Sequence, residues 1–135
     1  MKATRDHISF LSRLKTQAAF DSLRKTKTRW VSQGFAIQAI PQAIQQTPAN
    51  APPRPRFCVI TSKKTAKLAT DRNRMRRRLR AVIYEVLSTH ARTDMDYMIV
   101  ARTGALDRPM DDLRKDLKWC LKKLDLLRPI EHHAD

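Results

Sequence analysis

Two short apolar segments on either side of a long amphipathic one constrain the fold of this 135-residue chain more than any other feature. Residues 57–61 and 97–101 are runs of strand-forming side chains, and their nearly continuous apolarity favours strands covered on both faces. Residues 72–89 between them repeat apolar side chains with the period of an α-helix. The two strands can therefore pair in parallel as a βαβ unit. The apolar stripe of the helix consists of Met75, Leu79, Val82, Ile83 and Val86.

The remaining segments add elements on both sides of this unit. A short amphipathic helix is expected over residues 16–27, and a half-buried strand over residues 35–40. Residues 41–55 hold five of the seven prolines and predict an extended connection. Pro109 fits the first turn of a last helix. Its apolar stripe is formed by Leu113, Leu117, Cys120, Leu121 and Leu124. The predicted order is α-β-β-α-β-α, an α/β fold of the two-layer α+β sandwich type, and a chain of this length predicts one domain over residues 1–135.

The positive charge is concentrated in one part of the chain. The net charge is +15, well beyond the magnitude of about 2 to 8 that keeps a small domain soluble. Residues 56–80 carry ten basic residues and one acid, so this fifth of the chain holds more than half of the net charge. A surface that only contacts solvent usually carries both positive and negative residues, whereas residues 56–80 are almost entirely positive. The distribution therefore indicates a nucleic-acid surface.

The basic side chains lie on the sides of the central helix that its apolar stripe leaves free. At about 100° per residue, Asn73, Arg76, Arg77 and Arg80 lie opposite the stripe, and Arg74 and Arg78 flank it. An arginine guanidinium can donate two parallel hydrogen bonds to the oxygens of one phosphate, and an asparagine amide can donate to a sugar or a phosphate. The same residue types would suit a DNA major groove. The absence of a helix-turn-helix spacing and the mixed sheet favour RNA.

The order of these segments resembles the protein subunit of bacterial ribonuclease P. That family shows a strand, a Ser/Thr-Lys-Lys turn and an Arg-Asn-Arg sequence that opens a basic helix, which correspond here to residues 57–61, 62–64 and 72–74. The resemblance extends over about residues 13–124. Its flanking parts are Arg13-Leu14-Lys15, Phe20, Phe35, the segment 96–102 and Gly104.

Three features depart from the family pattern. The turn 64–71 is one residue longer than expected, lacks a glycine and ends in Asp71, where an apolar residue is usual. Leu23 and Arg24 stand where many members carry a second aromatic residue. The connection 41–55 is also long for the family.

The resemblance implies a left-handed βαβ crossover, an exception to the usual right-handed rule. It also implies that the protein joins a catalytic RNA, one protein to one RNA, and that the pair removes the 5′ leader of precursor tRNA by hydrolysis assisted by Mg²⁺ on the RNA. The residues implied to bind the RNA subunit are Lys63, Lys64, Arg72, Asn73, Arg74, Arg76, Arg77, Arg78 and Arg80. Those implied to line a cleft for the single-stranded leader are Lys15, Phe20, Phe35 and Gln38. Packing in the core remains an equal alternative for both phenylalanines.

No residue suggests catalysis by the protein itself. The four histidines have no convergent carboxylate or cysteine spacing, so neither a catalytic residue nor a protein metal site is predicted. The two cysteines are expected to be buried thiols, and Trp30 and Trp119 to serve packing or an interface. No apolar run approaches the roughly 18 residues of a membrane span, and a cytoplasmic protein is expected. A ribosomal or other structural RNA-binding protein without turnover, and a DNA-binding module, remain the alternatives.

Overall fold

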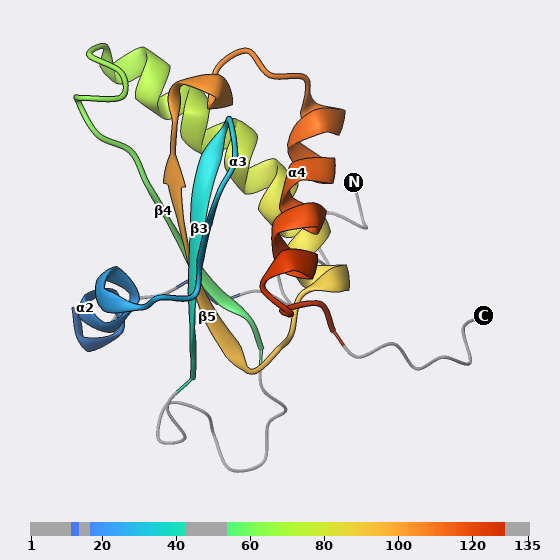
Figure 1. The fold of residues 1–135 in the computed structure, drawn as a ribbon. Helices are drawn as coiled ribbons and strands as arrows, with labels where there is room; N and C mark the ends of the chain where they lie inside the picture. Colours follow the sequence, from blue (N-terminus) through green and yellow to red (C-terminus); the bar gives the residue numbers. More distant parts are fainter. Residues whose placement is uncertain (1–11, 14–16, 43–53, 129–135) are drawn as a thin grey trace.

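The computed structural model describes residues 12–13, 17–42 and 54–128. It contains a five-stranded mixed sheet with α3 and α4 on one face and α2 on the other (Figure 1). The elements in chain order are β1 (Ser12–Arg13), α2 (Gln17–Lys25), β2 (Arg29–Val31), β3 (Phe35–Pro41), β4 (Arg56–Ile60), α3 (Ala69–His90), β5 (Met95–Ala101), the 3₁₀ turn η2 (Thr103–Ala105) and α4 (Met110–Lys123). No helix in these ranges is long and apolar enough to span a membrane.

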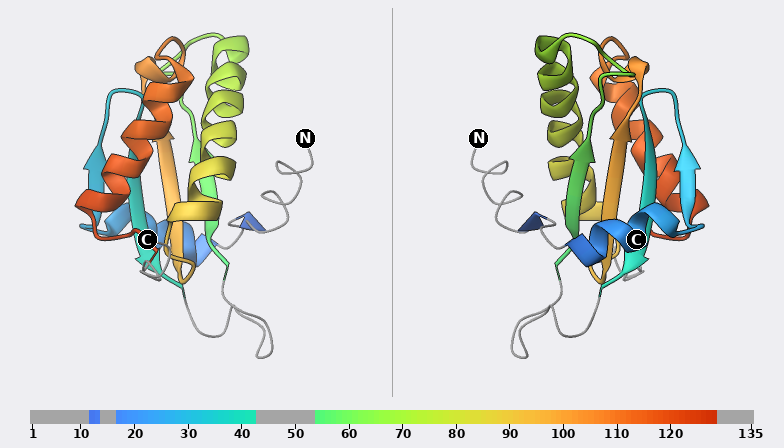
Figure 2. Two further views of the ribbon diagram at one scale, coloured as in Figure 1. Left: turned by 90° about the vertical axis from the view of Figure 1, so that its right-hand side faces the viewer. Right: turned by 90° about the vertical axis from the view of Figure 1, so that its left-hand side faces the viewer.

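The sheet has the order β1-β4-β5-β3-β2, with β5 at its centre. Strands β4 and β5 are parallel and joined by α3, whereas β3 is antiparallel to β5. Seen from the side of α3 and α4, both parallel strands point upward, α3 lies in front of them, and β5 lies to the left of β4 (Figure 2, left). The crossover is therefore left-handed. The predicted mixed α/β sandwich is confirmed, and the edge strands β1 and β2 are additions to the predicted order.

Side chains of the central strands alternate between two cores of unequal size. Tyr97 and Ile99 of β5 belong to the main core beneath α3 and α4. Met98, which lies between them in sequence, packs with Leu23 of α2 on the opposite face. Of the described residues, only the short helix α2 covers the second face, so this face is the less enclosed of the two (Figure 1).

Helix α3 begins earlier than its sequence predicts. The sequence predicts a start at Arg72, but the helix begins at Ala69, after Leu68, which is extended and offers no side-chain cap. The Arg72 amide already donates to the Leu68 carbonyl at 3.1 Å, which makes Leu68 the first acceptor of the helix. All five predicted stripe residues are buried, so the periodicity predicted the buried face correctly even though the start was wrong.

Two predicted boundaries shift or lie outside the described residues. The strand expected over 35–40 includes Pro41, which pairs with Met95. Most of the predicted 41–55 connection, residues 43–53, lies outside the described ranges. The single-domain assignment to residues 1–135 stays a prediction.

A buried ion pair joins the two parallel strands. Asp96 of β5 is 0% exposed and lies directly opposite Arg56 of β4 in the strand register. The Arg56 Nε and Nη2 atoms each donate to one Asp96 carboxylate oxygen, both at 2.7 Å. This two-bond geometry fixes the relative position of the strands as well as compensating the buried charge.

We expect the change Asp96→Ala to lower the free energy of unfolding by about 3–5 kcal/mol, because Arg56 would be left without its partner. The matched change Asp94→Ala removes an exposed ion pair with Arg92 and should cost at most about 1 kcal/mol. Urea unfolding of the two variants measures the difference. Equal costs would mean that the buried pair contributes no more than a surface pair.

Candidate nucleic-acid interface

The predicted RNA-binding residues gather at the edge of the sheet where β4 and β5 end and α3 begins (Figure 1). The chain leaves β4 through a tight turn in which the amides of Thr65 and Ala66 both donate to the Ser62 carbonyl at 3.1 Å. The Ser62 and Thr65 hydroxyls are also 3.1 Å apart. Lys63 and Lys64 form the exposed tip of this turn.

Sequence reasoning missed one cation at the same edge, Arg102. It directly follows β5, and its amide donates to the Gly34 carbonyl at 3.0 Å while the residue itself is exposed. Because β4 and β5 are parallel, the residues that follow them meet at one edge. That rule could have placed Arg102 at the same edge of the sheet as Lys63 from the sequence alone.

Three of the predicted RNA-binding arginines donate hydrogen bonds to other residues of the protein. Arg78 is the clearest case: its Nε donates to the Ala105 carbonyl at 2.8 Å, and its Nη2 donates to the Arg108 carbonyl. These bonds attach α3 to the segment between β5 and α4. The guanidinium is therefore occupied by the fold, and the structure favours a structural role for Arg78 over direct phosphate binding.

Arg72 and Arg76 hold the turn that precedes the helix. Arg72 Nη1 donates to the carbonyls of residues 66 and 67 at 2.9 and 2.8 Å. Arg76 Nη2 donates to Asn73 Oδ1 at 2.8 Å, and its Nη1 donates to the Thr61 hydroxyl. All of these acceptors are neutral, so the positive charge of both arginines remains uncompensated at the surface.

The other predicted cations have no hydrogen bond or ion pair with the part of the chain that the structure describes. Four of them are exposed and Arg80 is half-buried. The fold thus presents a set of unpaired cations on a framework fixed by three arginines. We call these residues the basic edge: Lys63, Lys64, Arg74, Arg77 and Arg80.

Two of the four predicted leader-cleft residues are engaged in the fold. Phe35 is 1% exposed and belongs to the main core under α3 and α4, on the face of the sheet away from α2, so its placement in the cleft is wrong. Gln38 lies on the α2 face, but it is 7% exposed and its Nε2 donates to the Leu23 carbonyl at 2.8 Å. Lys15 and the side chain of Phe20 lie outside the described part of the structure, although Phe20 belongs to α2.

The α2 face carries a different set of candidates. Half-buried side chains from three neighbouring strands pack beside Leu23 and Met98 and form an apolar floor that α2 covers incompletely. Sequence reasoning did not identify these side chains as a binding surface, because the nearly continuous apolarity of residues 57–61 and 97–101 predicted strands covered on both faces. We call these residues the cleft floor: Ile40, Cys58, Ile60 and Val100.

Both cysteines are free, with Cys120 buried and Cys58 half-buried in the cleft floor. Burial raises the pKa of the Cys58 thiol from an ordinary 9.0 to about 12, and the nearby charge of Asp96 adds to the shift. Burial has the same effect on Cys120, whose pKa is also about 12. Neither thiol is ionised at neutral pH. The described residues contain no group of three or more His, Cys, Asp or Glu side chains that could hold a metal ion.

Comparison with known proteins identifies the family. The family model described as Ribonuclease P matches residues 10–125. The chain is 35% identical over 118 residues to the ribonuclease P protein component of Paramagnetospirillum magneticum, covering 87% of this chain and 86% of that protein. It is 29% identical over 115 residues to that of Lactobacillus gasseri, covering 85% and 88%.

Solved structures agree with the fold. The Staphylococcus aureus RNase P protein superposes with a TM-score of 0.65 at 22% identity, covering 86% of this chain and 97% of that one. The Thermotoga maritima RNase P protein gives a TM-score of 0.63 at 18% identity, covering 83% and 96%. These structures have the fold described above.

Adjacent arginines on α3 provide a direct test of the basic edge. We expect Arg77→Ala to leave the melting temperature unchanged while weakening binding to structured RNA, with a salt dependence flatter by about 0.7 to 0.9 in slope. Arg78→Ala should lower the unfolding free energy by about 1–3 kcal/mol, because two partly buried carbonyls lose their donor. Arg29→Ala, at the far edge of the sheet, controls for the change in net charge. A salt slope as flat in the control as in Arg77→Ala would contradict the assignment.

The thiol in the cleft floor gives a pH-dependent prediction. The pKa of Cys58 is higher in the folded state than in the unfolded state, so the protonated thiol contributes to the free energy of unfolding below pH 9. This contribution to stability is lost as the pH rises through about 12. In a Cys120→Ser variant, Cys58 should react slowly with iodoacetamide at pH 8 and quickly in urea at the same pH. Rapid alkylation of the folded variant at pH 8 would mean that the thiol is not held in an apolar floor.

Proposed function

The chain belongs to the ribonuclease P protein family, and we propose that it binds the catalytic RNA of that enzyme through the basic edge. The observation that carries the proposal is the division among the cations. Arg72 and Arg76 fix the turn before α3, and Arg78 attaches α3 to the segment after β5. The five cations of the basic edge have no partner in the described part of the chain and can bind phosphate oxygens. A rigid framework supports tight binding because little side-chain and loop entropy is lost when the RNA docks.

The second part of the proposal concerns the 5′ leader of precursor tRNA. We infer that the single-stranded leader lies along the cleft floor beside α2. The floor is apolar and only half-buried, and α2 carries basic residues in its last turn, Arg24 and Lys25. A strand of RNA with its bases against the floor and its phosphates near α2 would use both features. Lys15 and Phe20 remain predicted members of this site.

The chemistry assigned to the protein is limited to binding and charge compensation. The described residues do not fit a metal ion, so no step of the proposal runs through a metal held by this chain. We propose that the Mg²⁺ needed for hydrolysis is bound by the RNA, and that the protein lowers the repulsion between two polyanions. No nucleophile or general base is assigned to the chain.

Reconstitution tests the function as a whole. The purified protein, added to a bacterial ribonuclease P RNA at low Mg²⁺, is expected to restore release of the leader from precursor tRNA. The protein alone should leave the substrate intact at any Mg²⁺ concentration, and leader release by the RNA-free protein would contradict the assignment. Tight binding of the RNA without leader release would instead favour a structural RNA-binding protein.

A further inference from the structure

A second basic surface lies on α4, away from the basic edge and from the cleft floor. The core-facing stripe of α4 contains Leu113, Leu117, Cys120 and Leu121. The side of the helix turned away from that stripe carries Lys115, Lys118 and Lys122, all exposed, at the i, i+3, i+7 spacing of one helical face. The proposed function uses none of these residues.

An indole ring lies among these lysines. Trp119 is 51% exposed, although large aromatic side chains usually bury most of their surface. Lys123 Nζ lies 4.5 Å from the centroid of the indole ring, a cation–π contact that holds the ring in position from one side. The ring is thus ordered and yet open to solvent.

The same residues line a hollow of about 350 Å³ between the ends of α3 and α4. Its lining consists of Trp119, Leu127, His90 and the three lysines of the α4 face, Lys115, Lys118 and Lys122. This volume lies at the lower end of the range of small-ligand sites. Lysine stems can cover the apolar wall while their ammonium groups remain in water at the rim.

The electrostatics of the hollow favour an anion. Two of the acids on α4 are already paired, Asp111 with Arg114 at 2.6 Å and Asp116 with Arg108 at 2.5 Å. Burial, and secondly the charge of Lys118, lowers the pKa of His90, so this imidazole is neutral at pH 7. The hollow therefore combines a flat apolar surface, a neutral imidazole and a rim of three positive charges.

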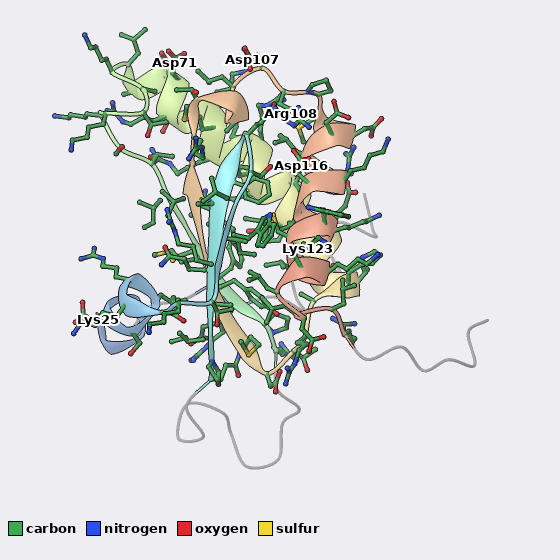
Figure 3. All side chains as sticks on the ribbon, in the orientation of Figure 1. Lys25, Asp71, Asp107, Arg108, Asp116 and Lys123 are labelled. Atoms are coloured by element: carbon green, nitrogen blue, oxygen red, sulfur yellow. The ribbon has the colours of Figure 1, made fainter. Side chains whose placement is uncertain are left out.

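The hollow is remote from both surfaces of the proposed function. His90 lies ten residues beyond Arg80, or about 15 Å along α3. Lys123 on α4 and Lys25 on α2 lie on opposite sides of the sheet, and Asp71 marks the far end of α3 (Figure 3). A ligand in this hollow would not compete with RNA at the basic edge or in the cleft.

We propose that this hollow binds one unpaired nucleotide of an RNA, with the base stacked on Trp119 and the adjoining phosphates bound by Lys118 and Lys122. An aromatic ring within a basic patch is the combination that single-stranded RNA requires. An acidic peptide would use the lysines but not the exposed indole. A duplex would keep its bases stacked on one another and leave the hollow empty. The inference adds a contact to the RNA-binding role proposed above.

Fluorescence of Trp119 can report on the site directly. The chain has two tryptophans, so the change Trp30→Phe leaves Trp119 as the only indole. Titration of this variant with a uridine pentanucleotide should quench the fluorescence with saturation. An abasic pentamer of equal charge should bind at least about fivefold more weakly and cause no quenching, because it lacks the stacking contribution. Equal binding of the two pentamers would overturn the proposal.

Two pairs of variants locate the contact. Lys118→Gln with Lys122→Gln should weaken the quenching titration and flatten its salt dependence by about 0.7 in slope per lost contact. Lys63→Gln with Lys64→Gln, an equal change in charge at the basic edge, should leave the titration unchanged. In competition with a labelled pentanucleotide, Trp119→Phe should retain the affinity, and Trp119→Leu should weaken it at least about fivefold, as the abasic pentamer does.

The remaining outcomes all count against the proposal. Quenching that depends on Lys63 and Lys64 would place the oligonucleotide elsewhere, and no quenching at saturating pentanucleotide would leave the hollow without a nucleotide. A pentaglutamate peptide that quenches at lower concentration than the pentanucleotide would point to an acidic protein partner. Because the assay uses the protein alone, its result is independent of whether the reconstituted enzyme releases the leader.

Discussion

The arrangement of this protein depends on the parallel pairing of β4 with β5, which the buried Arg56–Asp96 ion pair fixes at its start. A carboxylate with no exposure can be stable only where its partner is held in place, so the pair allows one register of the two strands. That register determines where α3 crosses the sheet. With the strand order given, a right-handed crossover would put α3 on the face now occupied by α2. The left-handed path places α3 on the same face as α4, and among the described elements α2 alone lies on the other face (Figure 2).

Because their hydrogen bonds go to neutral acceptors, the same arginines fix the structure of the surface and also keep it positively charged. Arg72, Arg76 and Arg78 donate to backbone carbonyls, a hydroxyl and an amide oxygen, none of which carries a negative charge. Ion pairs would have fixed the helix equally well while cancelling the positive field. The exposed ion pairs of α4, such as that of Arg114 with Glu85, do cancel charge. The uncompensated positive charge of α3 is therefore concentrated at its start, where the proposed RNA contact lies.

The sequence predicted what depends on periodicity and missed what depends on tertiary context. The buried stripe of α3 and the two central strands follow from spacing alone. Strands β1 and β2 have two and three residues, too short to show a period. Phe35 and Gln38 are three residues apart, so on one strand they face opposite sides of the sheet and cannot both line one cleft. The segment 35–40 alone does not indicate which of these sides faces the larger core. The polar neighbour instead binds a carbonyl of α2. Arg78 and Arg77 are identical in type, and the carbonyls of Ala105 and Arg108, which accept from Arg78, distinguish their roles.

The proposed leader site and the proposed RNA-binding edge are physically continuous, because both include residues that lie on β4 or directly after it. Cys58 and Ile60 of the cleft floor lie on β4, and the turn that carries Lys63 and Lys64 follows that strand directly. Val100 of the floor lies on β5, two residues before Arg102, which follows that strand. A leader lying along these strands would reach the basic edge at their carboxyl ends. The direction of β4 and β5 would therefore align the leader with the end of the sheet where the catalytic RNA is proposed to bind, without any contact to the identity of a base.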